Sequence, residues 1–579
     1  MSQDSNIVVD KGKSSISDLW TKEDYWAIWL GFFIIATAFF LYFNFSPTQE
    51  FQDKIAQQNA VMESEAAKAP FKTIAWHKAK DAKGKLKAED GALGKFFKHW
   101  TAAPGSWKSN PLEALILSQE QADAKNDAAK PKYKEAKAKT EKAFALAQTA
   151  EAAAVAANFQ DVALNDEAKA QIADWRAAHK KESDAKKKVS SKPYNRIPTL
   201  VVLCLVFALF FSIGIKFMGK DTAGFLKGFA VVFGVSTLAY LMGGQSVAKQ
   251  YGVGAEAWGV IIGMLIANTV GTPDFAKKAC EVEYFIKTGL VLLGAEVLFN
   301  KIVAIGIPGI FVAWVVTPIV LICTFIFGQK ILKMPSKTLN IVISADMSVC
   351  GTSAAIATAA ACRAKKEELT LSIGLSLVFT AIMMIAMPAF IKAVGIPEIL
   401  GGAWMGGTID ATGAVAAAGA FLGEKALYVA ATIKMIQNVL IGVTAFGVAV
   451  YWCTRVECEA GKSVGWMEIW HRFPKFVLGF LSASVLFSFI DGSLGSDMGY
   501  TMVDHGVVRG FTRLFREWFF ALSFAAIGLA TNFRELAHYF KGGKPLVLYV
   551  CGQSFNLVLT LTMAYIMFYL VFPEITAQI

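Results

Sequence analysis

Long apolar segments recur along most of the chain and constrain its fold more than any other feature. From Thr199 to Phe572, runs of about 18 or more residues with few charges follow one another. In a bilayer an α-helix can satisfy its backbone hydrogen bonds internally, and about 20 apolar residues span the hydrocarbon core. The sequence therefore predicts an all-α polytopic membrane protein, and 55% of its 579 residues are hydrophobic.

About thirteen transmembrane helices are expected, each long enough to cross the bilayer. They are predicted near 25–44, 198–217, 225–243, 254–271, 284–300, 303–329, 338–362, 368–392, 402–423, 426–452, 473–491, 517–533 and 545–572. A weak internal sequence repeat, in which residues 285–294 resemble residues 519–528, is typical of folds with inverted repeats.

The chain divides by composition into four parts. Residues 1–24 form a polar tail, and 25–44 form the first transmembrane helix. Residues 45–196 are rich in Ala and Lys, which favours long helices, and predict an extramembrane helical hairpin whose second helix starts near 165–167. Residues 197–579 form the transmembrane transporter domain.

Basic residues in the connecting loops give the expected orientation. Most of them fall on one side when the crossings are followed, which places the N-terminus in the cytoplasm and residues 45–196 outside it. The cluster Arg363-Ala364-Lys365-Lys366 contradicts this count. The expected location is the bacterial inner membrane. The net charge of +11 reflects these loops, and no nucleic-acid partner is expected.

Two glycine-centred, hydroxyl-rich stretches interrupt the apolar segments. They are 344–355, which contains Asp346 and Gly351, and 406–414, which contains Asp410 and Gly413. Non-helical backbone at membrane depth is tolerated only where it is buried in protein or lines a cavity. Many secondary transporters build their substrate site where such broken helices meet, so we expect two broken, crossing helices here.

Ionisable side chains inside the spans are functional candidates, because leaving them unpaired in the bilayer is costly. Asp346 and Asp410 can bind a coupling cation or exchange a proton, or they can instead cap a half-helix. Lys434 lies mid-span, with Gln437 and Asn438 on the same helix face. It can hold an anion or form a structural ion pair. Glu296, near a span end, is predicted to be interfacial.

The same segments resemble the YeiH family of proposed sulfate exporters. The matching elements are 288–294, 348–358, Gly407-Thr408-Ile409-Asp410, 415–419 and Lys434-Met435. The resemblance implies a fold related to cation–proton antiporters and bile-acid transporters, with inverted repeats and elevator-type motion. It implies a substrate site at the two breaks and Lys434. Together with the polar residues above, the expected substrate-binding residues are Ser348, Cys350, Gly351, Thr352, Ser353, Thr408, Asp410, Thr412, Gly413, Lys434, Gln437 and Asn438.

This chain departs from the family pattern at several polar positions. The family often has His-Glu where this chain has Asp410-Ala411, Gln where it has Ala414, and Arg where it has Gln437. These differences alter the polar groups at the site, so the transported anion can differ as well. The long insertion at 45–196 is also unlike a minimal family member.

The leading hypothesis is a secondary active exporter of a small sulfate- or sulfonate-type anion. Its coupling would use Asp346 and Asp410 with Na⁺ or H⁺, and no other cofactor and no bound metal is expected. One alternative is a cation–proton antiporter that uses the two aspartates. Another is a membrane receptor or scaffold that acts through the hairpin. No enzyme motif is present. The expected partners are a small inorganic or organic anion and the lipid bilayer, with a homodimer as a further option.

Overall fold

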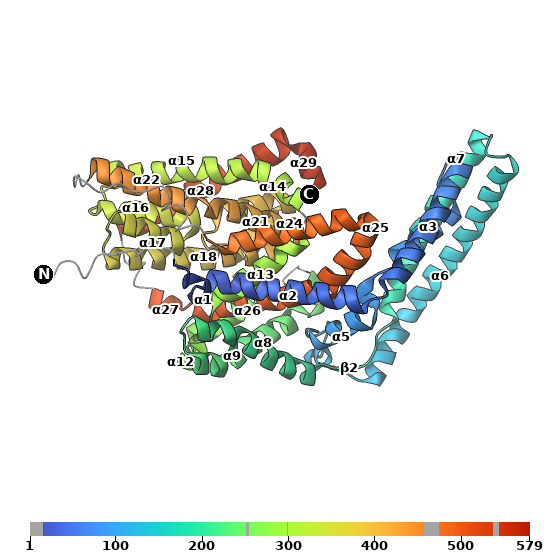
Figure 1. Ribbon diagram of the computed structural model, residues 1–579, viewed down its shortest axis with the longest axis horizontal. Coiled ribbons are helices and arrows are strands. Elements are labelled where there is room, and N and C mark those ends of the chain that lie inside the picture. The colour runs from blue at the N-terminus through green and yellow to red at the C-terminus, as the bar shows by residue number, and fades with distance from the viewer. Residues whose placement is uncertain (1–14, 251–253, 298, 457–473, 537–542) are drawn as a thin grey trace. The chain divides into compact units, whose positions relative to one another are not determined.

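The computed structural model describes residues 15–250, 254–297, 299–456, 474–536 and 543–579 (Figure 1). Contacts divide the chain into two compact units. Unit 1 comprises Met1–Ile35, Cys204–Phe489 and Thr512–Ile579, and unit 2 comprises Ala36–Leu203 and Ile490–Phe511.

Every helix or strand element of unit 1 within its described residues is a helix. Its first elements are α1 (Asp18–Thr21), α2 (Glu23–Phe45), α8 (Ile197–Phe217), α9 (Thr222–Gly243), α10 (Ser246–Gln250), α11 (Ala255–Thr269), α12 (Asp274–Lys277), α13 (Val282–Glu296), α14 (Phe299–Ile310), η4 (Phe311–Val315), α15 (Val316–Ile326) and η5 (Phe327–Ile331). They are followed by α16 (Lys337–Ala345), η6 (Asp346–Cys350), α17 (Thr352–Ala361), α18 (Lys366–Val394), α19 (Glu398–Thr408), α20 (Thr412–Leu422), α21 (Glu424–Asn438), α22 (Leu440–Arg455), α24 (Phe476–Leu494), α26 (Arg513–Ala530), α27 (Phe533–Leu536), α28 (Lys544–Tyr565), η9 (Ile566–Val571) and α29 (Pro573–Gln578).

The membrane-spanning character of this fold follows from the length and composition of its helices. Within the described residues, eight helical segments are long and apolar enough to cross a membrane: Glu23–Phe45, Ile197–Phe217, Thr222–Gly243, Ala304–Ile331, Lys366–Val394, Glu424–Trp452, Phe476–Leu494 and Lys544–Val571. The other predicted spans fall on α11, α13, α26 and the α16–α17 and α19–α20 pairs, which are shorter, charged or interrupted. The expected class, an all-α polytopic membrane protein, is confirmed.

Glycines let the helices around the two breaks approach closely. On α19, a Cβ at Gly402 would lie 2.7 Å from Ala426 O of α21, and one at Gly406 would lie 2.8 Å from Ala430 O. Gly402 and Gly406 are four residues apart, and so are Ala426 and Ala430, so the two contacts lie along one helix–helix interface. Small residues at such interfaces are common for helices that pack in membranes. This interface between α19 and α21 holds Lys434 and Gln437 of α21 close to the second break.

The two segments of the weak internal repeat, 285–294 and 519–528, belong to α13 and α26, which pack against each other. A Cβ at Gly289 of α13 would lie 2.5 Å from the ring of Phe520 on α26. Further along α26, a Cβ at Gly263 of α11 would lie 2.7 Å from Gly528 Cα. These two helices therefore form a tight group with α11.

Unit 2 holds the Ala/Lys-rich segment. Its elements are α3 (Thr48–Lys68), α4 (Ile74–Gly84), η2 (Ala88–Asp90), α5 (Ala92–Trp100), η3 (Pro111–Ala114), β1 (Ile116–Leu117), α6 (Gln119–Ala156), α7 (Val162–Lys188), β2 (Tyr194–Asn195), α25 (Ser496–Met498) and η7 (Gly499–Thr512). Helices α2, α8 and α24 and segment η7 contain residues of both units.

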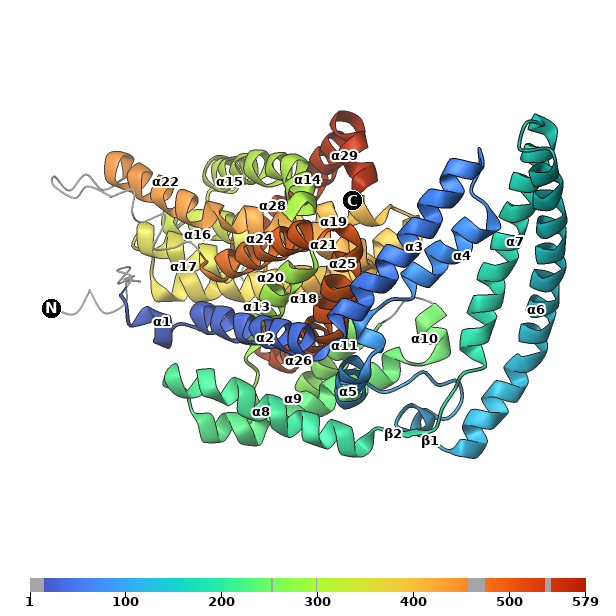
Figure 2. The same cartoon turned by 45° about the vertical axis from the view of Figure 1, so that its right-hand side comes forward.

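A long helical hairpin forms as the composition predicts. Helices α6 and α7 lie side by side in both views (Figure 2). Ser118 begins α6 with a capping box, in which its Oγ accepts from Gln121 N and its own N–H donates to Gln121 Oε1. Helix α7 begins at Val162, a few residues before the predicted start, because Asp161 Oδ1 accepts from the N–H groups of Ala163 and Leu164.

The hairpin is pinned at its base and along one face. β1 pairs with β2 in an antiparallel register of Ile116 with Asn195 and Leu117 with Tyr194, which brings the two ends of the hairpin together. Ile74 of α4 packs into an apolar cluster with residues of α6 and α7. Arg176 of α7 forms a two-pronged ion pair with Asp81 of α4.

Candidate functional site

The first break is a change of direction that only glycine adopts easily. Helix α16 continues into the π-helical turn η6, and α17 begins directly after Gly351. Gly351 has φ of +60° and ψ of −130°, a conformation that side chains with a Cβ rarely adopt. A Cβ at Gly351 would also lie 3.2 Å from Ser376 Oγ and 3.3 Å from Asp410 Cβ.

The second break lies against the first. Helix α19 ends at Thr408, Ile409 and Ala411 are extended, and α20 begins at Thr412. The same position of a Cβ at Gly351 would lie 3.7 Å from Asp346 Oδ1, so the aspartates of both breaks flank Gly351. Each break therefore presents the end of one half-helix and the start of another at a shared position.

Lys434 and Gln437 satisfy the carbonyl ends of the first half-helices. Lys434 Nζ donates to Val349 O at 2.9 Å and to Gln437 Oε1 at 2.8 Å. Gln437 Nε2 lies 3.0 Å from Ser348 O and 3.2 Å from Gly407 O, and so contacts both breaks. Carbonyls at a helix C-terminus lack partners in the helix and carry a partial negative charge, so a buried ammonium group is well placed there.

The two aspartates are fully buried in a group of hydroxyls. Ser372 Oγ of α18 donates to Asp346 Oδ2 at 2.6 Å. Asp410 Oδ2 accepts from Ser376 Oγ at 3.0 Å and from the hydroxyl of Tyr549 on α28. In the described part of the chain, the other oxygen of each carboxylate, Oδ1, has no hydrogen-bond partner. Each aspartate therefore keeps one carboxylate oxygen that can accept a further donor.

A cavity of about 410 Å³ lies beside the breaks. Its walls include Cys350, Thr352 and Ser353 at the start of α17, and Ala411 and Thr412 at the start of α20. The first backbone N–H groups of a helix have no acceptor within it, and its N-terminus carries a partial positive charge. Both helix starts therefore offer donors to the same cavity.

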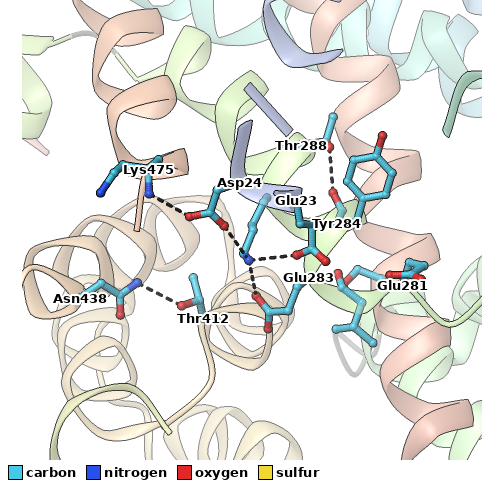
Figure 3. Close-up of polar contacts among 12 residues, drawn as sticks. Glu23, Asp24, Glu281, Glu283, Tyr284, Thr288, Thr412, Asn438 and Lys475 are labelled. Atoms are coloured by element: carbon cyan, nitrogen blue, oxygen red, sulfur yellow. Dashed lines mark hydrogen bonds and ion pairs between the residues drawn. The ribbon is translucent and has the colours of Figure 1, made fainter. Parts of the chain in front are cut away.

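Asn438 adds a side chain amide to this wall. Its Nδ2 donates to Thr412 Oγ1 at 3.1 Å (Figure 3). The residue is 1% exposed, and its Oδ1 has no partner among the described residues. The amide thus keeps one polar atom available at the cavity wall.

An ion cluster also lines this cavity, and its polar contacts are drawn in Figure 3. Lys287 Nζ of α13 lies 2.9 Å from Glu23 Oε1, 2.9 Å from Asp24 Oδ1 and 3.7 Å from Glu283 Oε2. The backbone N–H of Lys475 donates to Asp24 Oδ2 at 2.8 Å. The start of α2 is thereby fixed to α13 and to the start of α24.

The structure separates the residues predicted for the substrate site into two groups. Those that line the cavity are Cys350, Thr352, Ser353, Thr412 and Asn438. Those that lie in the packed interior are Ser348, Gly351, Thr408, Asp410, Gly413, Lys434 and Gln437, with Asp346. Ser348 and Thr408 donate to carbonyls of the preceding turn of their own helices, so these two hydroxyls stabilise the helices next to the breaks.

Glu296 is buried and has a charged partner on another helix. Its side chain is 2% exposed, and Arg516 Nε of α26 lies 2.5 Å from its Oε1. The side chain is therefore packed between helices rather than exposed, and its interfacial depth in the bilayer stays a prediction. A charged partner from another helix makes burial feasible, and nothing near Glu296 in the sequence indicates that partner.

Several polar residues at the site were missed by sequence reasoning. Ser372 and Ser376 lie four residues apart on α18, and Tyr549 and Gln553 lie four apart on α28. Gln553 Nε2 donates to Thr408 O at 2.8 Å. Paired polar residues at helical spacing within apolar spans were the available signal. Lys287, four residues after Glu283, carried the same signal.

Comparison with known proteins identifies the family. Residues 227–549 match the family model described as "Conserved hypothetical protein 698". A UPF0324 membrane protein of Nitratidesulfovibrio vulgaris is 72% identical over 576 residues, which cover 100% of this chain and 99% of that relative. The chain belongs to the UPF0324 family of membrane proteins. This confirms the expected membership of the YeiH family.

More distant relatives share part of this UPF0324 protein. A UPF0324 membrane protein of Rhodopirellula baltica is 60% identical over 374 residues, covering 64% of this chain and 68% of the relative. One of Nitrosomonas europaea is 32% identical over 415 residues, covering 62% of this chain and 82% of the relative. No solved structure matches the chain.

Proposed function

We propose that this UPF0324 protein is a secondary active transporter that exports a small anion of the sulfate or sulfonate type. It would lie in the bacterial inner membrane with its N-terminus in the cytoplasm. The observation that carries the proposal is that α17 and α20 both begin at one cavity, beside hydroxyls and the amide of Asn438. Helix starts of this kind bind anions through free N–H groups and the helix dipole.

The distribution of charge at the crossing supports an anion at these helix starts. The carbonyl ends of the half-helices already have partners in Lys434 and Gln437. The donor ends are the ones that face the cavity. On this proposal, Lys434 acts on the substrate indirectly, by fixing the crossing and adding positive charge behind it. Elevator-type motion of the crossing would carry the anion across the membrane.

Asp346 and Asp410 are the proposed coupling residues. They flank Gly351 in a buried setting, and each keeps one carboxylate oxygen without a partner among the described residues. Two buried carboxylates so close together repel each other when both are ionised, which favours binding of a proton or of Na⁺. Release of that ion on one side of the membrane would drive export.

Reconstitution of the full-length chain into liposomes tests the proposal. Labelled sulfate, sulfite and methanesulfonate would be followed under imposed pH and Na⁺ gradients. We expect flux of at least one anion that depends on a gradient. Asp410→Asn should abolish the gradient dependence, and Lys434→Ala should abolish or strongly reduce flux. Lys227→Ala, at an exposed position on α9, is the control. Flux that persists unchanged in Lys434→Ala would contradict this site.

A cation–proton antiporter is a second candidate, favoured by the free oxygens of the two aspartates. It predicts proton release when Na⁺ is added to liposomes that contain no transported anion. That release should disappear in Asp410→Asn. An anion exporter predicts instead that proton movement requires the anion.

A further inference from the structure

Three carboxylates surround the single positive charge of Lys287. Glu283 lies one turn before it on α13, at 3.7 Å. Glu23 and Asp24 come from α2, far away in the sequence, and both lie closer, at 2.9 Å. All four side chains line the cavity into which α17 and α20 open. Lys287 is 15% exposed in its side chain, so it faces the cavity rather than the protein interior.

The cavity has the wrong charge for an anion as long as α2 contributes its carboxylates. Its lining contains the cations Lys22, Lys287 and Lys475. It also contains the carboxylates Asp18, Glu23, Asp24 and Glu283, which gives a formal charge of −1. Without Glu23 and Asp24, the same lining carries +1. An anion at the starts of α17 and α20 therefore gains from removal of these two carboxylates.

The partners of Lys287 also differ in where they lie in the chain. Lys287 and Glu283 lie within residues 227–549, the segment that matches the family model. Glu23 and Asp24 lie outside it. The cation thus belongs to the matched segment, and its two closest partners belong to the N-terminal helix α2, which that match does not include.

We infer that Lys287 is a substrate-binding residue and that Glu23 and Asp24 occupy the position of the substrate anion on it. The inference rests on the proposed anion transport and assigns a further cation to that site. When the anion binds, its oxygens replace the carboxylate oxygens of Glu23 and Asp24 at Lys287 Nζ. The bond from the N–H of Lys475 to Asp24 breaks in the same step. The two carboxylates act as a built-in competitor, which an anion of higher charge displaces more effectively.

The competing interpretation is structural, with Lys287 only anchoring α2. The two interpretations differ in what neutral partners should do. If the carboxylates compete with substrate, neutral amides at both positions should strengthen anion binding. If they only anchor α2, the same change should lower stability and leave the apparent affinity unaltered.

Transport kinetics of the full-length chain in liposomes separate the two. Labelled sulfate serves as the divalent probe and methanesulfonate as the monovalent probe. For Glu23→Gln/Asp24→Asn we expect KM for sulfate to fall by about fivefold or more, the scale of a modest coupling between sites, with the maximal rate retained. The preference for sulfate over methanesulfonate should narrow. Lys287→Gln should raise KM for both anions.

The matched control removes the same two charges away from the cavity. Asp127→Asn/Glu135→Gln neutralises one Asp and one Glu of α6 that pair with Lys130 and Lys139 and do not line the cavity. It should leave KM unchanged. Glu23→Gln alone keeps the contact of Asp24 with Lys475 and should lower KM for sulfate by a smaller factor. This single variant replaces the double variant if the latter is unstable.

The outcomes distinguish this inference from the proposed function. Wild-type flux with the same KM in Glu23→Gln/Asp24→Asn as in the control would overturn the inference and leave anion transport intact. An unchanged KM in Lys287→Gln would do the same. Absence of flux for both anions in the folded wild type would overturn the proposed function, and the inference with it.

Discussion

Gly351 is the residue on which the first break most directly depends. It has positive φ, and a Cβ at this position would lie 3.2 Å from Ser376 Oγ and 3.3 Å from Asp410 Cβ. A helix cannot pass through such a residue, so α17 begins afresh and its N-terminus faces the cavity. The backbone conformation of Gly351 thus has two consequences. It turns the first N–H groups of α17 toward the cavity, and it lets the two aspartates lie close together.

Substitution of Gly351 should therefore cost stability. Gly351→Ala is expected to lower the free energy of unfolding by about 1–3 kcal/mol, the cost of holding a residue with a Cβ in a sparsely populated conformation. Thermal and denaturant unfolding in detergent would measure this. Gly234→Ala is the control, because that glycine is exposed on α9 with nothing within 4 Å of a Cβ. Equal stability of the two variants would contradict the strain argument.

At the scale of elements, ion pairs join helices that lie far apart in the sequence. Arg516 of α26 pairs with Glu296 of α13, with side chains 5% and 2% exposed. Beside it, Arg513 Nη2 lies 2.9 Å from Glu424 Oε1 at the start of α21. These contacts link α13 and α26 to the helix that carries Lys434.

Loss of one partner from this pair should be more harmful than loss of both. Arg516→Met is expected to destabilise the protein by about 3–5 kcal/mol, because Glu296 is left buried without its cation. The double variant Arg516→Met/Glu296→Gln should recover part of that loss. Unfolding of the three proteins in the same detergent would measure it. A double variant no more stable than Arg516→Met would contradict the charge explanation.

In unit 2, a buried carboxylate predicts a dependence of stability on pH. Burial alone raises the pKa of Glu89, but Lys98, at 2.8 Å, and His505 more than offset this, and the pKa lies below its ordinary value. The resulting stabilisation is present above the unfolded pKa, about 4.3, and is lost as pH falls through the folded pKa.

Acid titration of stability tests this contact. The wild type should lose stability between about pH 5 and pH 3, where glutamates in the unfolded chain take up protons. Glu89→Gln should be less stable than the wild type at neutral pH, and the difference between the two should shrink in acid. Denaturant unfolding at several pH values would show it. A difference that stays constant with pH would rule out the carboxylate as its source.

At the scale of the whole molecule, the hairpin and the candidate site lie in different compact units. The pairing of β1 with β2 closes the base of the hairpin, with Leu117 opposite Tyr194. No residue of α6 or α7 lines the cavity. The hairpin is therefore expected to be dispensable for the proposed transport.

Deletion of the hairpin tests that expectation. Replacement of residues 119–188 by a short Gly/Ser linker should leave flux intact, because β1 and β2 already hold the ends of the deleted segment together. Flux in liposomes, compared with the wild type at equal protein content, is the measurement. Loss of flux in a folded variant would support the alternative in which the hairpin carries the function.

Much of the site could be expected from individual residues. Asp346, Asp410 and Lys434 were singled out because charges within apolar segments need partners, and the structure places all three at the crossing. Their partners could not be expected in the same way. Ser372, Ser376 and Tyr549 are common residues in membrane helices, and only the packing of α18 and α28 brings them to the aspartates.

The sequence by itself determined the class of the protein, the two breaks and the hairpin. These follow from local physics, since apolar length, glycine content and helix propensity act on neighbouring residues. Only the tertiary structure decided which polar groups face the cavity. Cys350 lines it while Lys434 lies behind the crossing, and Lys287 meets Glu23, which lies 264 positions away in the chain. Such contacts join residues distant in sequence, and local pattern carries no information about which distant side chain will be the partner.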